Sequence, residues 1–263
     1  MSEVDDGRLP SAATPSEAFG ETIAELADES IDDAQRRRAL GRLASQLRRR
    51  GVGDLFKPRS AMRWVADAIG EGVPHLPIRS VEVLRTHFPG LTDDEIGDRL
   101  VRNAARATGA IGVAGGSIAA VEWTATPTLL TAPVLLATET VAVVAVEIKL
   151  VAELHEVYGQ PVAGNVAQRS IALLKSWSER RGVNPLAAGT AISSAILATG
   201  VRKELRDRLL RRFGRNLTSY GPMLTGAAVA SYLNRRATLA LAGQVRADLR
   251  RNQRRALEFN PPD

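Results

Sequence analysis

The sequence predicts an all-α fold, a multi-helix bundle with Gly/Ala-rich hydrophobic helical hairpins, and three observations lead to this class. No segment alternates apolar and polar residues as a half-buried strand does. Capping and helix-breaking residues recur at helix-length spacing along the chain. Aromatic residues make up only 4% of the 263 residues, whereas apolar residues make up 44%. The core must therefore be built from small and branched side chains, which favours close helix–helix contact.

The longest expected helix runs from Pro133 to Gly159, and the other helices are expected to pack around it. Proline suits the first turn of a helix, and a glycine followed by a proline is a common stop signal. Its first half, Val134 to Val146, is apolar on nearly every side and should be surrounded by other groups. Its second half is predicted to present a solvated face made by Lys149, Glu153 and Glu156.

Charge divides the chain unevenly. Residues 1–34 contain ten acidic residues and one basic residue, Arg8, for a charge of −9. Because the whole chain has a net charge of +6, the remaining residues carry +15. We expect four regions: a disordered acidic tail at 1–29, an Arg-rich helical region at 30–90, a hydrophobic helical domain at 91–255 and a disordered tail at 256–263. The acidic tail is expected to act as a detachable cover for the basic body, with a plain solubility tail as the alternative.

The Arg-rich region should contain short helices. The run Ser30-Ile31-Asp32-Asp33 indicates a helix start, and Gly51 should end that helix. Further short helices are expected at 58–69 and 77–87, followed by a turn at 87–90. Apolar residues recur along one side of the first helix, with arginines around them: Ile31, Leu40, Leu43 and Leu47.

A capping box predicts the next helix start. Thr92 is followed three residues later by Glu95, so a helix should begin at Asp93. Further along, small residues recur at intervals of four and should let another helix backbone approach closely. These residues are Gly112, Gly116 and Ala120.

The remaining segments indicate four more helical stretches. Residues 165–180 are amphipathic, 183–201 are almost uncharged, 202–215 are basic, and 222–251 change from small to basic residues. A membrane-spanning helix needs roughly 20 apolar residues. The runs 126–146 and 183–201 reach that length only by including polar residues, so both are marginal spans.

Catalytic and cofactor motifs are absent from the sequence. There is no cysteine, which excludes disulfides and thiolate chemistry. His155-Glu156 begins like the zinc-protease helix motif, but Gly159 stands where the second histidine is needed. The glycines between 109 and 116 do not fit the dinucleotide fingerprint, and no phosphate-binding loop is present. We predict no catalytic residue, no metal ligand and no cofactor.

Two sets of residues are candidate sites. Glu139 and Glu147 lie in the apolar part of the central helix, where a carboxylate is costly unless it is paired; the alternative is that both glutamates face water. The expected buried polar pairing involves Glu139, Glu147, Tyr158, Asn234, Arg235 and Arg236, with either arginine as a partner. The expected anionic-surface binding residues are Arg202, Lys203, Arg206, Arg211, Arg212 and Arg215.

The second half of the chain, about residues 95–250, resembles the EcsC-like family. The resemblance lies in the segment Glu147 to Gly159 and in the segment Gly221 to Thr238, a small-residue helix followed by an Asn and a basic turn. It is similar, more loosely, to the paired hydrophobic helices behind some small GTPase domains. The resemblance implies a membrane-linked or accessory protein and transfers no catalytic residue.

These observations lead to one expected function and one alternative. We expect a non-enzymatic, membrane-associated helical accessory protein that contacts an anionic membrane surface or a membrane protein. It should lie at the cytoplasmic face of the membrane or in the cytoplasm, because no secretory signal is present. The alternative is a soluble helical module that binds a protein partner or a polyanion such as nucleic acid.

Overall fold

The computed structural model describes residues 14–51, 53, 58–125, 131–180 and 223–259. Within these ranges the chain forms eight α-helices, one short 3-10 helix and no strand, which confirms the predicted all-α class. In chain order the elements are α1 (Pro15–Leu26), α2 (Asp33–Arg49), α3 (Pro58–Gly72), η2 (Val73–His75), α4 (Val81–His87), α5 (Asp93–Ala125), α6 (Thr131–Val157), α7 (Val166–Arg180) and α9 (Met223–Phe259).

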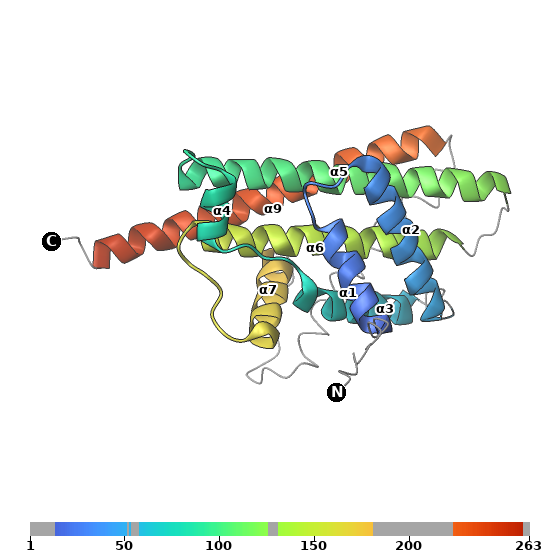
Figure 1. Cartoon of the computed structure of the whole chain (residues 1–263), viewed down its shortest axis with the longest axis horizontal. Coiled ribbons are helices and arrows are strands. Elements are labelled where there is room, and N and C mark those ends of the chain that lie inside the picture. Colours follow the sequence, from blue (N-terminus) through green and yellow to red (C-terminus); the bar gives the residue numbers. More distant parts are fainter. Residues whose placement is uncertain (1–13, 52, 54–57, 126–130, 181–222, 260–263) are drawn as a thin grey trace, which may run out of the picture.

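Three long helices, α5, α6 and α9, lie side by side, and α1, α2, α3 and α7 cross one side of them (Figure 1). Helix α5 runs antiparallel to α6, because Tyr158 contacts Asp94 near one end of the pair and Glu139 lies beside Gly115 towards the other. Helix α5 is also antiparallel to α9. Figure 1 shows that these two helices stay together over most of their length.

The close contact between α5 and α9 depends on glycine. A Cβ added at Gly112 would lie 2.8 Å from the backbone nitrogen of Ser231, and one at Gly116 would lie 2.5 Å from the Cβ of Ala227. Any side chain at either position would separate the two backbones. The predicted small-residue contact is therefore confirmed at these two glycines, with α9 as the approaching helix. The side chain of Ala120, the third predicted member, lies outside the described residues.

Helix α6 occupies the centre of the bundle. Every residue from 141 to 154 is buried, and α6 contacts helices from both ends of the chain. The expected boundaries hold to within two residues, with Gly159 just beyond the helix at a φ of 67°. The predicted solvated face of its second half is wrong. Lys149 and Glu153 are buried, because the loops that precede α2 and α4 cover them.

The N-terminal region is more ordered than predicted. Residues 15–26, which were expected to belong to a disordered tail, form α1, and Thr14 caps its first turn. The apolar side chains of Phe19, Ile23 and Leu26 share one face of α1 and are completely or almost completely buried. This packing contradicts a detachable tail over residues 15–29. Residues 1–13 lie outside the described part of the chain.

The other local signals have mixed outcomes. Helix α2 begins after Asp32, and α5 begins at Asp93, where Thr92 and Glu95 form the expected capping box. Gly51 and Gly90 adopt positive φ at the expected turns. Helix α4 is shorter than the predicted 77–87. Helix α9 continues to Phe259, so the disordered tail predicted at 256–263 is wrong for residues 256–259. The predicted stretches at 183–201 and 202–215 lie outside the described residues.

Candidate functional site

A buried layer of polar side chains joins α5, α6 and α9. The amide of Asn234 donates to the carboxylate of Glu139 at 2.8 Å and to the backbone oxygen of Thr108 at 3.3 Å. Asn234 and Glu139 were both predicted members of a buried polar pairing, and the structure brings them together. Asn234 thereby fixes the position of α9 against both neighbouring helices.

Glu147 follows Glu139 on α6, towards the C-terminal end of that helix, and is completely buried. Its Oε2 accepts a hydrogen bond from Trp177 Nε1 at 2.8 Å, and its Oε1 accepts one from the Thr238 hydroxyl at 3.1 Å. The predicted pairing of these carboxylates with Arg235 or Arg236 is wrong. Both arginines are exposed, because they lie on the side of α9 that faces away from α6.

Tyr158, the remaining predicted member, belongs to a different group at the end of α6. Its hydroxyl donates to Asp94 at 2.6 Å and accepts from Arg246 at 2.9 Å. Burial and the hydrogen bond to Asp94 raise the pKa of the Tyr158 phenol above its usual value. Arg246 and Arg250 also contact acidic residues of α5, so this group ties α9 to both α5 and α6.

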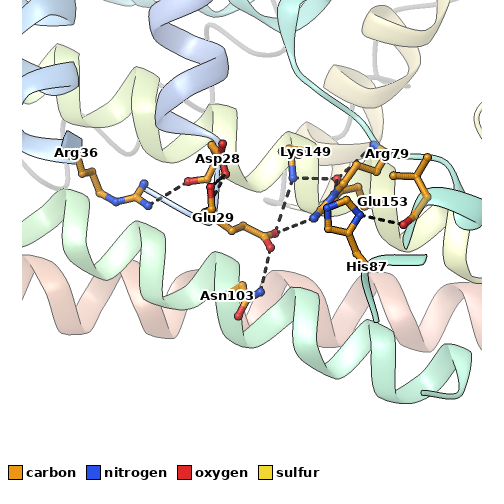
Figure 2. Close-up of polar contacts among 10 residues, drawn as sticks. Asp28, Glu29, Arg36, Arg79, His87, Asn103, Lys149 and Glu153 are labelled. Atoms are coloured by element: carbon orange, nitrogen blue, oxygen red, sulfur yellow. Dashed lines mark hydrogen bonds and ion pairs between the residues drawn. The ribbon is translucent and has the colours of Figure 1, made fainter. Parts of the chain in front are cut away.

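A second polar group fills the space between α6 and the turn that joins α1 to α2 (Figure 2). Arg79 donates from Nε and Nη2 to the two carboxylate oxygens of Glu153 at 2.7 and 2.8 Å, and Lys149 Nζ lies 2.8 Å from Glu153 Oε1. Glu29 lies 3.3 Å from Arg79 and accepts from Asn103 at 3.0 Å. Glu29, Arg79, Lys149 and Glu153 form what we call the ion network.

Burial makes the ion network electrostatically strong. Glu153 is fully buried, and the Lys149 side chain is only 6% exposed. Burial by itself lowers the pKa of Arg79, but the hydrogen bonds and charges of Glu153 and Glu29 outweigh that effect and raise it above its ordinary value. Arg79 therefore stays charged and holds the segment before α4 against α6.

Three members of the ion network, Glu29, Arg79 and Lys149, line a cleft of about 370 Å³, which we call the polar cleft. Figure 2 shows charged side chains converging from the α1–α2 turn, from the segment before α4 and from α6, with the amide of Asn103 from α5 beside them. The lining residues are Asp28, Glu29, Ser30, Pro77, Arg79, His87, Asn103 and Lys149. Sequence patterns indicated Ser30 at a helix start and Lys149 on the central helix, but they did not predict a cleft. The only sequence feature that pointed to the ion network was the i,i+4 spacing of Lys149 and Glu153.

A third feature lies on the outside of the molecule, where α5 and α9 meet. Exposed arginines from both helices and most of the exposed large apolar side chains of the described residues lie there. Arg235 Cβ lies 3.9 Å from the position that a Cβ on Gly109 would take, which places this side chain at the junction of the two helices. We define the α5–α9 outer face by its exposed residues: Arg102, Arg106, Val113, Val229, Tyr232, Leu233, Arg235, Arg236 and Leu239.

Several predicted features are tested only in part. The six predicted anionic-surface residues, Arg202 to Arg215, lie outside the described residues. Among the residues that the structure does describe, no group of three or more His, Cys, Asp or Glu side chains could hold a metal ion. The Nδ1 of His155 lies 3.0 Å from the Gln160 backbone oxygen, which accepts the hydrogen bond. Within the same described ranges, no helix is both long and apolar enough to cross a bilayer.

Comparisons of the chain with protein-family models, with curated proteins and with solved structures find no match. The EcsC-like resemblance therefore stays a prediction that rests on its two quoted segments.

Proposed function

We propose that this protein binds peripherally to anionic membrane surfaces through the α5–α9 outer face. The observation that carries the proposal is that exposed apolar side chains and exposed arginines share this face. Surface-bound amphipathic helices combine these two features, because the apolar residues enter the headgroup region while basic residues attract anionic lipids.

The apolar part of the face is concentrated on α9. Val229, Tyr232, Leu233 and Arg236 recur at i, i+3, i+4 and i+7, so they lie on one side of that helix. Val229, Tyr232 and Leu233 are 54%, 60% and 51% exposed. Of the eight large hydrophobic residues that are exposed in the described part of the chain, five belong to the α5–α9 outer face. Exposed apolar groups gathered in this way favour an interaction surface over a chance distribution.

The arginines supply the charge for the same surface. Arg102 and Arg106 are exposed on α5, one turn apart, and Arg235 and Arg236 are exposed on α9. Each basic residue close to an anionic bilayer contributes about 1 kcal/mol of attraction. Arg236 also donates to the Tyr232 hydroxyl at 3.4 Å, so the basic and apolar parts of the face are in contact. The EcsC-like resemblance supports the same proposal, since it implies a membrane-linked role.

The test is co-sedimentation of the full chain with vesicles. We expect binding to vesicles of phosphatidylcholine with phosphatidylglycerol and much weaker binding to phosphatidylcholine alone. Substituting Arg235→Gln with Arg236→Gln should weaken binding about tenfold or more, because about 2 kcal/mol of attraction is lost. The matched control is Arg37→Gln with Arg38→Gln, another adjacent pair of exposed arginines, on α2.

A second pair of variants separates membrane binding from simple attraction to polyanions. Tyr232→Ser with Leu233→Ser should weaken vesicle binding, whereas Val166→Ser, at an exposed apolar position of α7, should not. If the arginine variants lose binding to double-stranded DNA while the apolar variants keep all vesicle binding, the nucleic-acid alternative is favoured. Equal vesicle binding by the wild type and both α9 variants would refute the proposal.

A further inference from the structure

We propose that the polar cleft binds a small zwitterion, a molecule that carries an ammonium group and a carboxylate, such as a free amino acid. The proposal is independent of membrane binding, because the polar cleft and the α5–α9 outer face share no residue. It rests on three observations: an almost buried ammonium group with unused donors, an opposing carboxylate with an unused oxygen, and the charge balance of the walls.

The ammonium group of Lys149 has three N–H donors. One is directed at Glu153 Oε1, 2.8 Å away, and Glu29 Oε1 lies 3.8 Å away, beyond hydrogen-bond distance. Among the described residues no other acceptor contacts this ammonium. The Lys149 side chain is only 6% exposed, so leaving its donors without hydrogen bonds costs free energy. Lys149 lines the polar cleft, so a ligand oxygen in the cleft can accept from it.

The basic side of the cleft has a second donor. Arg79 uses Nε and Nη2 for Glu153 and Glu29, while its Nη1 has no hydrogen-bond partner among the described residues. Two cationic groups with free donors therefore line the same cleft (Figure 2). A carboxylate accepts hydrogen bonds from such groups at more than one oxygen, which makes it the best match for this side.

The acidic side is formed by the turn between α1 and α2. Asp28 Oδ1 accepts from the backbone nitrogen and the hydroxyl of Ser30, each at 2.8 Å. These two bonds fix the orientation of the carboxylate. Its other oxygen, Oδ2, has no partner in the described part of the chain, and Asp28 lines the cleft. An ammonium group of a ligand is the natural partner for this oxygen.

The charge balance favours a zwitterion over simpler ligands. The lining carries two positive groups, Arg79 and Lys149, and two negative groups, Asp28 and Glu29. A simple anion would lie close to the two negative groups, and a simple cation would lie close to the two positive groups. A zwitterion adds no net charge and matches each side with its opposite. A volume of about 370 Å³ accommodates a small ligand of this kind.

The experiment uses the full chain and isothermal titration calorimetry with glycine, L-serine and L-glutamine as probes. Acetate and ethylammonium, which each carry half of the charge pattern, are the ligand controls, and glucose represents an uncharged polar ligand. We expect at least one amino acid to bind with a Kd of about 1 mM or tighter and the three controls to bind at least about tenfold more weakly.

Asp28→Asn tests the site itself. It keeps an oxygen for Ser30 and removes the charge, so amino-acid binding should weaken at least about tenfold. Asp93→Asn, the same change at a surface position of α5, should leave binding unchanged. Asp28→Glu restores the charge and should recover most of the affinity, which separates loss of binding from loss of folding. No binding by any amino acid, preferential binding of glucose, or unchanged binding by Asp28→Asn would overturn the proposal.

Discussion

Glu147 on α6 and Trp177 on α7 are joined by a hydrogen bond of 2.8 Å, and both side chains are completely buried. The bond connects the central helix to a helix that begins after an intervening loop. It also orients the largest side chain of the core through its single polar atom. The position of α7 against α6 thus depends on a carboxylate that the sequence alone could have assigned to the surface.

Trp177→Phe should destabilise the protein through this contact. The substitution keeps an aromatic ring but removes the donor to a charged acceptor, which costs about 1.5–3 kcal/mol, and it also removes part of the ring. Urea unfolding followed by circular dichroism would measure the loss. Trp64→Phe is the control, because Trp64 is only partly buried at the edge of the core. Equal losses for the two variants would contradict the role assigned to the Glu147 hydrogen bond.

Glycine-to-alanine substitutions should have opposite effects at two positions. In Gly112→Ala the new methyl group would meet the α9 backbone at 2.8 Å, and we expect a loss of about 1–3 kcal/mol from overpacking. In Gly41→Ala the methyl group meets nothing within 4 Å. There we expect a gain of about 0.5–1 kcal/mol, because alanine favours a helix. Thermal unfolding of both variants gives the comparison, and a neutral Gly112→Ala would show that α5 and α9 can separate freely.

Glu153→Gln should be among the most destabilising single substitutions in the ion network. It leaves Arg79 and Lys149 facing a neutral amide, and removal of one partner from a buried pair costs about 3–5 kcal/mol. The Arg79 side chain is 21% exposed, so we expect a value near the lower limit. Asp93→Asn, which breaks the exposed pair with Arg85, should cost less than about 1 kcal/mol. Chemical unfolding of both variants would reveal whether the two ion pairs differ in this way.

Stability should fall in mild acid because of His155. Burial lowers the pKa of its imidazole, and the nearby positive charge of Arg180 adds to the effect. Above a pH of about 6.5 both the folded and the unfolded states hold a neutral ring, so His155 contributes no pH dependence. As the pH decreases below that value the unfolded state takes up the proton first, and the free energy of unfolding decreases.

The measurement for His155 is the pH dependence of urea unfolding between about pH 5 and 8 for the wild type and for His155→Gln. The variant should show a smaller decrease in stability below about pH 6.5. His87→Gln is the control, because His87 is exposed on α4. A steeper decrease in the His155 variant than in the wild type would show that the sign of the effect is wrong.

Local signals in the sequence were sufficient for the main helices. The Thr92–Glu95 capping box, the turn at Gly90 and the end of α6 at Gly159 depend on residues within a few positions of each other. The close approach at Gly112 and Gly116 was also predictable, because two glycines one turn apart have few other uses on a buried helix. The identity of the approaching helix was not, since spacing within α5 contains no information about α9.

The ion network shows why the rest could not be predicted. Glu153 and Lys149 show the spacing of an exposed pair on α6, and their burial depends on Arg79, which lies 74 residues before Glu153. Asn103 and Glu29 are likewise 74 residues apart. Helix α1 was missed for a different reason. Its net negative charge favoured disorder, whereas three apolar residues on one face were enough to bury it against α2, α3 and α6.

The glycine contacts between α5 and α9 have a consequence for how the chain reaches its native state. Contacts between these helices join residues as distant as Asp94 and Arg250, 156 positions apart. Because synthesis proceeds from the N-terminus, α5 leaves the ribosome long before α9 exists. The face of α5 that carries Gly112 and Gly116 therefore stays uncovered until α9 has been made. Pairing of helices so distant in sequence is slow, and until it occurs the uncovered face of α5 can associate with other unfolded chains. A chaperone that shields α5 during translation would therefore raise the yield of native protein, and a ribosome that stalls before α9 would release a product prone to aggregation.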